Sequence, residues 1–187
     1  MQPTATEQLI LHMLCNIHKK LGITDSFDPD LIASAVSSDD CWVLDWAYDI
    51  KDEGARNPPH VTEVVNTLDM YSFLSQGFER LDAADKAAVA SEIPRVRTAV
   101  EFPGYDGNNE GQYRTAAAYM VNDLDRFESM KDVGERNSHT PMAGTYARQY
   151  QVFEPIRATL IQRTLTADEI VSVLSAYLVG SSAYAGP

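Results

Sequence analysis

Cysteine is scarce in this sequence. The only two, Cys15 and Cys41, form neither a CxxC pair nor a disulfide framework, so both thiols are expected to be reduced and buried. Zinc-finger sites are excluded for the same reason. The opening residues MQPTATEQ lack the basic segment and the small-residue cleavage site of a signal peptide. No apolar run approaches the roughly 20 residues that a membrane span requires. These absences predict a cytoplasmic protein.

Basic residues are few and scattered. The sequence holds 15 lysines and arginines against 27 acidic residues, which gives a net charge of −12. A protein with this negative net charge repels the phosphate backbone of nucleic acids unless a local basic patch attracts it. No run of residues in the sequence forms such a patch. Nucleic acid is therefore not an expected partner.

Common catalytic fingerprints are missing as well. The GxSxG, HExxH, Walker and dinucleotide-binding patterns are all absent, which lowers the expectation of the usual enzyme classes. Asp106 and Glu110 occupy the first and fifth positions of a calcium-binding loop pattern, but the twelfth position, which must supply an acidic ligand, is Ala117. Ser138 and His139 are adjacent in a loop, where side chains point in different directions, so a hydrolase pair is not expected. We expect no metal, no cofactor and no membrane partner.

What remains is a globular composition with strong helical periodicity. The 187 residues are 44% hydrophobic and 22% charged, which suffices for a domain that buries about 70% of its unfolded surface. Apolar residues recur at helical spacing in eight segments, 4–21, 28–36, 42–48, 59–81, 82–93, 108–127, 140–161 and 166–178. The sequence predicts an all-α protein with a single compact domain of seven or eight helices over 1–180. A short extended segment near 96–101 and a flexible tail at 181–187 complete the prediction.

Capping patterns mark several helix starts. The spacing Thr-x-x-Glu of a capping box occurs at 4–7 and at 166–169. Thr140 followed by Pro141 pairs a capping hydroxyl with a first-turn proline, which predicts a helix start there. Pro155 removes a hydrogen-bond donor inside that helix, so the helix should kink or restart before it continues to residue 161.

Two apolar features need packing partners. Residues 70–78 are apolar on most sides of their helix, which is typical of a helix that is central in its domain or shared with a second subunit. Asp69 beside this run is expected to be ion-paired or at the helix edge. Trp42 and Trp46, four residues apart, share a helix face and are expected to anchor the core, with an aromatic ligand platform as the alternative.

Five segments carry a resemblance to a known family. In order, VTEVVNTLDMYSFL, FPGYDGNNE, DLDRFE, NSHTP and VFEPIRA together resemble the YfbU family of bacterial proteins, over about residues 5–179. The resemblance implies a compact, mostly helical protein, in a family with no established activity or catalytic residue. His139 is more variable in the family pattern, which weakens a histidine-dependent mechanism. The positions that carry the pattern most firmly are Gly104, Asp106, Glu110, Arg126, Asn137 and Pro141.

Three functional hypotheses follow. The first is an interaction or regulatory protein that acts as a homo-oligomer through its surface. The second is an enzyme or small-ligand sensor with a polar site built from Asp106, Glu110, Arg126 and Asn137, in which the arginine holds an anionic group. The third is an accessory protein of a mobile element or toxin system. The second hypothesis requires the four side chains to converge on one cleft.

Overall fold

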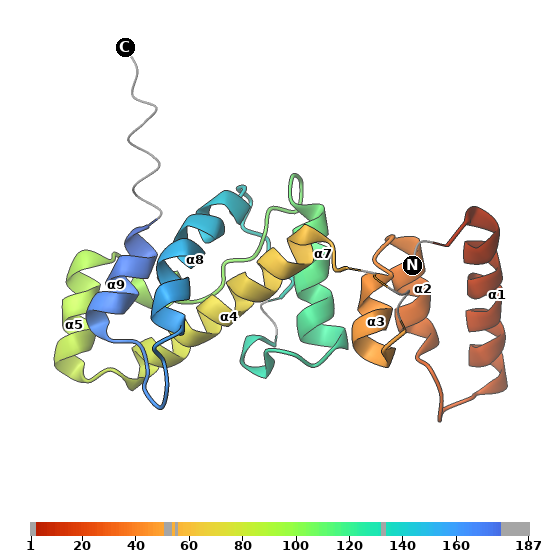
Figure 1. The fold of residues 1–187 in the computed structure, drawn as a ribbon, viewed down its shortest axis with the longest axis horizontal. Helices are drawn as coiled ribbons and strands as arrows, with labels where there is room; N and C mark the ends of the chain where they lie inside the picture. The colour runs from red at the N-terminus through yellow and green to blue at the C-terminus, as the bar shows by residue number, and fades with distance from the viewer. Residues whose placement is uncertain (1–2, 51–53, 55, 132–133, 177–187) are drawn as a thin grey trace, which may run out of the picture. The chain divides into compact units, whose positions relative to one another are not determined.

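The computed structural model describes residues 3–50, 54, 56–131 and 134–176. Within these residues the chain has nine α-helices, no sheet and one isolated β-bridge (Figure 1). The predicted all-α class is confirmed. Contacts divide the chain into unit 1, residues 1–59, and unit 2, residues 60–187, and each is described by itself. The predicted domain limits of 1–180 stay a prediction, and the predicted tail at 181–187 lies outside the described residues.

Unit 1 contains three helices, and α2 lies between the other two in the packing. These are α1 (Ala5–Leu21), α2 (Pro29–Ser37) and α3 (Trp42–Tyr48), and both α1 and α3 contact α2. The predicted capping box begins α1, because the Thr4 hydroxyl accepts from Glu7 N at 3.3 Å and the Glu7 carboxylate accepts from Thr4 N at 2.8 Å.

The two tryptophans of α3 are packing residues, as predicted. Their ring centroids lie 6.3 Å apart with an interplanar angle of 88°, an edge-to-face arrangement. Trp42 is buried, and its indole N–H donates to Asp40 Oδ1 at 2.9 Å. Trp46 is half-buried and donates to Asn57 Oδ1 at 3.0 Å. Each indole N–H thus has a hydrogen-bond acceptor, as expected for a tryptophan that is removed from water.

Unit 2 is arranged along α4 (Pro59–Arg80). Figure 1 shows α4, in yellow, with α7 beside its first half and α5 and α9 beside its C-terminal end, and side-chain contacts agree. The other elements are α5 (Ala83–Glu92), α6 (Val96–Ala99), α7 (Gly111–Ala118), the π-helical turn η1 (Tyr119–Asp123), the 3₁₀ turn η2 (Glu128–Met130), α8 (Ala143–Arg157) and α9 (Ala167–Ser175).

The apolar second half of α4 lies in the core of unit 2. Met70, Tyr71, Leu74 and Phe78 are at most 3% exposed. The central position, one of the two predicted alternatives, thus accounts for this run of apolar residues.

Asp69, at the edge of the same run, is ion-paired, as predicted. Its Oδ2 accepts from Arg157 Nε at 2.8 Å, and the guanidinium lies 4.4 Å from the centroid of the Phe73 ring. This arrangement joins α4 to the end of α8.

The segment near 96–101, predicted to be extended, is instead the short helix α6. Arg95 has a φ of 55° in the left-handed region and turns the chain after Pro94. Val96 and Val100 are both buried. Their spacing of four residues fits one helical turn as well as it fits alternation, so the prediction of a strand was wrong.

The helix predicted over 108–127 is shorter and changes its winding. It begins at Gly111 and ends at Asp123 in the wider η1 turn, closed by a hydrogen bond from Leu124 N to Tyr119 O at 2.9 Å. The predicted stripe is buried at Ala116, Ala117 and Met120, but Leu124 and Phe127, which follow the π-turn, are only half-buried.

The helix predicted over 140–161 is also shorter. It runs through Pro155 without a restart and ends at Arg157. Thr159 N then bonds to Ile156 O at 2.8 Å, a tighter turn that ends the helix, and Ile161 is 79% exposed. Thr140 does not cap this helix: its hydroxyl donates to Ser138 O at 3.1 Å, and the first helical residue is Ala143.

Candidate functional site

The loop that follows α6 and the loop that precedes α8 meet at one point. Tyr105 and Asn137 form the isolated parallel β-bridge, and Ser138 N donates to Tyr105 O at 3.3 Å. Gly104 makes this approach possible, because it has a φ of 93° and a Cβ placed there would lie 2.0 Å from Arg136 O. Glycine is therefore required at this position by both backbone conformation and space.

Asp106 and Asn137 organise these two loops. The Asp106 carboxylate accepts from the Asn109 side-chain amide and from Asn108 N at 3.1 Å, and these two hydrogen bonds, the first more than the second, hold its pKa below the ordinary value. Asn137 Oδ1 accepts from Gly107 N at 3.1 Å and from His139 N at 2.9 Å. Both side chains bond to backbone groups that the loops would otherwise leave unpaired.

Glu110 links the first loop to the start of α8. It is 7% exposed, and its Oε1 accepts from Met142 N at 2.8 Å and from Ala143 N at 2.7 Å. Its other oxygen, Oε2, accepts from Asp106 N at 3.0 Å. The carboxylate thus caps a helix that begins more than 30 residues later, and its charge complements the dipole of that helix.

Arg126 lies at the other end of the helical run that starts at Gly111. It is exposed, and its backbone N–H donates to Met120 O at 2.9 Å. At 1.5 Å per residue, Met120 is about 15 Å along the axis from Glu110, which is farther than an arginine side chain reaches. The structure thus brings together three of the four predicted site residues, Asp106, Glu110 and Asn137, and places the arginine apart from them.

The polar oxygens of this cluster are engaged in hydrogen bonds within the protein. The hydrogen bonds to Asp106, Glu110 and Asn137 come from backbone amides and one side-chain amide within the same two loops. Ser138 Oγ donates to Thr140 O at 2.7 Å, so this hydroxyl is engaged by the backbone. The cluster is a structural joint between α7 and α8.

This joint uses the segments that carry the family pattern, and comparison with known families agrees. The YfbU domain profile matches residues 1–176. The chain belongs to the YfbU family. A search of curated proteins finds no match. Among the described residues of this YfbU chain, no helix combines the length and apolar character needed to cross a membrane.

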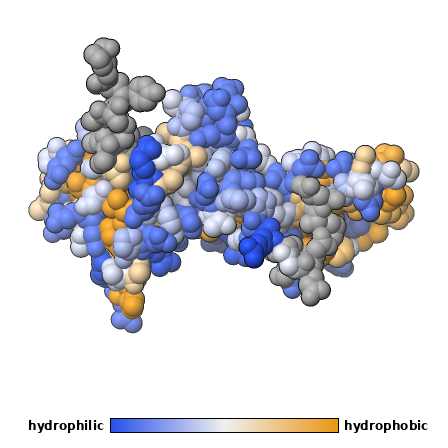
Figure 2. All heavy atoms as spheres, turned by 45° about the horizontal axis from the view of Figure 1, so that its top comes forward, coloured by the Kyte–Doolittle hydropathy of each residue, from blue (hydrophilic) through white to orange (hydrophobic). Residues whose placement is uncertain are grey.

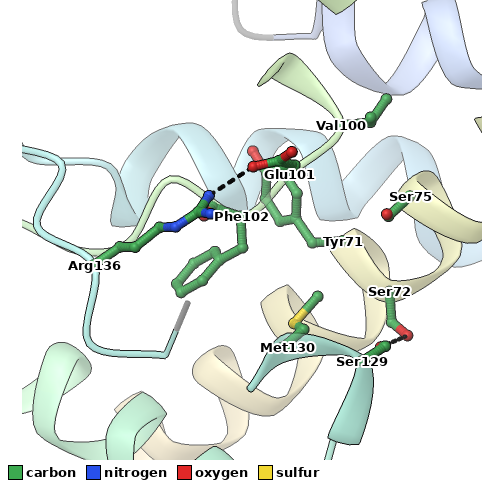
Figure 3. Close-up of a pocket in the computed structure, with 9 residues that line it drawn as sticks. All are labelled: Tyr71, Ser72, Ser75, Val100, Glu101, Phe102, Ser129, Met130 and Arg136. Carbon is green, nitrogen blue, oxygen red and sulfur yellow. Dashed lines mark hydrogen bonds and ion pairs between the residues drawn. The ribbon is translucent and has the colours of Figure 1, made fainter. Parts of the chain in front are cut away.

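A first cavity of unit 2 lies beside the joint and has a volume of about 250 Å³ (Figure 3). On one side Arg136 Nη1 pairs with Glu101 Oε2 at 2.9 Å, and on the other the Ser72 and Ser129 hydroxyl oxygens lie 3.5 Å apart. Arg136 Nη1 also donates to the backbone oxygen of Phe102 at 3.4 Å, and Figure 3 shows the Phe102 ring turned away from the ion pair. Because the only cationic side chain among the described residues of its lining is paired, this cavity has little spare charge for an anionic ligand.

A second cavity of about 230 Å³ lies among α4, α7 and α8 of this YfbU domain. Of the described residues that line it, Glu63 alone is charged, and Tyr113 Oη donates to Glu63 Oε2 at 2.8 Å. Sequence reasoning missed this pair because 50 residues separate the two partners. Four tyrosines line the cavity, namely Tyr105, Tyr113, Tyr146 and Tyr150.

The apolar residues that predicted the helix over 4–21 form an exposed face on α1. Its six members are each at least 50% exposed, whereas the side chains of Leu11 and Cys15 on the opposite face are half-buried or buried. Figure 2 shows the hydrophobic colour gathered over this helix. The apolar face consists of Leu9, Ile10, Met13, Leu14, Ile17 and Leu21.

Proposed function

We propose that this YfbU-family protein is a cytoplasmic interaction protein that works as a homodimer, with the apolar face of α1 as its dimer surface. The exposure of that face carries the proposal. The proposed location is supported by Cys15 and Cys41, which are free and buried as expected in a reducing compartment.

The apolar face is uncovered within unit 1. At 100° per residue its six side chains spread over about 140° of the helix circumference, centred opposite the side that packs on α2. Exposed apolar patches larger than a few hundred Å² usually mark interaction surfaces, and six half-exposed large side chains form a patch on the order of 500 Å². A helix that only covered α2 would need no such face.

A second copy of the chain is the occupant that fits best. An isologous pair would bury the patch twice, roughly 1,000 Å² in total, which is the lower limit for a specific interface. The first turn of α1 carries Glu7 and the last turn carries Lys20, both near the edges of the apolar face, whereas Lys19 pairs with Asp30 of α2. Antiparallel pairing therefore sets opposite charges near each other at both ends and opposes the two helix dipoles, whereas parallel pairing sets like charges together.

Light scattering coupled to size exclusion tests the proposal on the full chain. We expect a dimer in the micromolar range, and we expect Met13→Glu with Ile17→Glu to convert it to a monomer with unchanged helix content. Ile161→Glu is the matched control, because Ile161 is 79% exposed on unit 2 and should leave the dimer intact. A wild-type protein that stays monomeric at every concentration would exclude this function.

The alternative of an enzyme or sensor at Asp106, Glu110, Arg126 and Asn137 has weaker support. The three residues that meet use their oxygens to hold backbone amides, and the backbone of Arg126 bonds to Met120 O, which is about 15 Å along the helix from Glu110. A ligand role for unit 2 is better sought in its second cavity.

A further inference from the structure

We infer that the cavity among α4, α7 and α8 is a binding site for a small organic ammonium ion. The inference is independent of the dimer surface, because every residue that lines the cavity lies in unit 2. Glu63 and the four tyrosines supply the two kinds of group that recognise such ions, a carboxylate and electron-rich ring faces.

The charge of the lining selects for cations. Glu63 is the only ionisable carboxylate or amine in it, and no lysine, arginine or histidine contributes to the described lining. Tyr113 holds one carboxylate oxygen, Oε2, while Oε1 has no partner among the described residues. That oxygen remains to receive an N–H donor or to lie against a methylated ammonium.

The hydrogen bond between Tyr113 and Glu63 keeps the negative charge on the Glu63 carboxylate and the proton on the Tyr113 phenol. It is the main reason that the pKa of Tyr113 rises to about 12, with burial and the charge of Glu63 as further causes. The phenol therefore stays neutral and donating at physiological pH. The same bond directs one oxygen of the Glu63 carboxylate toward Tyr113.

Rings of three elements surround the remaining space. The Tyr105 centroid lies 5.2 Å from that of Tyr113 at an interplanar angle of 32°, and 5.3 Å from that of Tyr146 at 82°. Tyr146 and Tyr105 are each 1% exposed and form the closed wall of the cavity, whereas Tyr113 and Tyr150 are half-buried and can present ring surface to a ligand. A preorganised group of rings binds a cation without losing side-chain entropy on binding.

The size of the cavity limits the ligand. Its volume of about 230 Å³ is below the roughly 300–1,000 Å³ of sites for drug-sized molecules. Ala143 and Ala147 on α8 provide the free space, because longer side chains at these positions would fill it. A headgroup such as trimethylammonium or a short alkylammonium fits this space, whereas a nucleotide does not.

Binding of choline and of butylammonium to the full-length protein tests the inference by titration in NMR spectra. We expect saturable shifts confined to tyrosine rings and to amides around the cavity for at least one of the two cations. The neutral isostere of choline, 3,3-dimethylbutan-1-ol, has the same shape without the charge and should bind at least about tenfold more weakly.

Two substitutions on α4 separate the site from general electrostatics. Glu63→Gln should weaken binding about tenfold or more, because it removes the one negative charge of the lining. Glu79→Gln removes an exposed carboxylate of the same helix and should leave binding unchanged. Both positions are exposed, so circular dichroism should show the same fold for both variants.

The inference is overturned if neither cation shifts the tyrosine signals. Equal affinity for choline and its neutral isostere, or equal affinity of the wild-type protein and Glu63→Gln, would also overturn it. Tyr150→Leu gives an independent check, since it should weaken cation binding through loss of a ring while Glu63 stays in place.

Discussion

Glu110 accepts a hydrogen bond from Ala143 N at 2.7 Å, so a side chain in one loop caps a helix that starts 33 residues later. Met142 N donates to the same oxygen at 2.8 Å. A helix N-terminus normally finds its cap within its own sequence. Here Thr140 stands near the expected position but bonds to Ser138 O, and the tertiary contact replaces the local cap.

Removing that carboxylate should destabilise unit 2. We expect Glu110→Ala to lower the free energy of unfolding by about 2–4 kcal/mol, because it leaves buried backbone amides without acceptors. Glu110→Gln keeps one acceptor oxygen, so it should lower the free energy of unfolding by less than Glu110→Ala does. Urea unfolding, monitored by circular dichroism, measures the free energy of unfolding of both variants. Glu92→Ala, at the exposed end of α5, is the control, and its free energy of unfolding should differ from that of the wild-type protein by under about 0.5 kcal/mol. Equal stability of Glu110→Ala and the control would refute the capping role.

Gly104 should tolerate no side chain. A Cβ at this position would lie 2.0 Å from Arg136 O, and its φ of 93° is strained for any other residue. We expect Gly104→Ala to destabilise the protein by more than about 3 kcal/mol or to prevent folding. Gly111→Ala is the control, because nothing lies within 4 Å of its Cβ position and it begins α7. Thermal unfolding should show Gly111→Ala at least as stable as the wild-type protein.

Acid should weaken the joint between α7 and α8. Two hydrogen bonds hold the pKa of Asp106 below its ordinary value. The bond from the Asn109 side-chain amide has the larger effect, and the bond from the Asn108 backbone amide has the next largest. A carboxyl with a lowered folded pKa adds stability that is complete above its unfolded pKa, about 4, and is lost as pH falls through the folded value. We expect the melting temperature of Asn109→Ala to approach that of the wild-type protein as the pH is lowered below about 4. A difference that is constant from neutral to acidic pH would contradict this.

Distances between the two copies should reveal the antiparallel α1 pair. Burial raises the pKa of the native thiols of Cys15 and Cys41, so spin labels should favour introduced cysteines on the exposed positions Thr6 and Asn16. At 1.5 Å per residue, labels at Thr6 should lie roughly 20–25 Å apart and those at Asn16 about 10 Å. Pulsed spin resonance measures both. Parallel helices would place both pairs at about 10 Å.

Local signals in the sequence predicted the helices well. The capping box of Thr4 and Glu7 and the one of Thr166 and Glu169 both form, because all their partners lie within one turn. The tryptophan pair of α3 packs for the same reason, since four residues place two side chains on one helix face. The YfbU resemblance was also visible in the order of short segments, and the match over 1–176 confirms it.

Predictions failed where a local pattern fitted two structures or where a distant partner decided the outcome. The alternation of Val96 and Val100 is equally compatible with one helical turn, and the turn at Arg95 selected the helix. The start of α8 moved from Thr140 to Ala143 because Glu110, on another loop, supplies the cap.

The sequence by itself determined the helical class, most helix positions and the family, since these depend on periodicity and on contacts within a few residues. Only the tertiary structure decided that Asp106, Glu110 and Asn137 form a joint, that Glu63 meets Tyr113, and that one apolar face of α1 remains uncovered while α4 is enclosed. An amphipathic pattern states which side of a helix is apolar. Which element covers that side depends on the path of the whole chain.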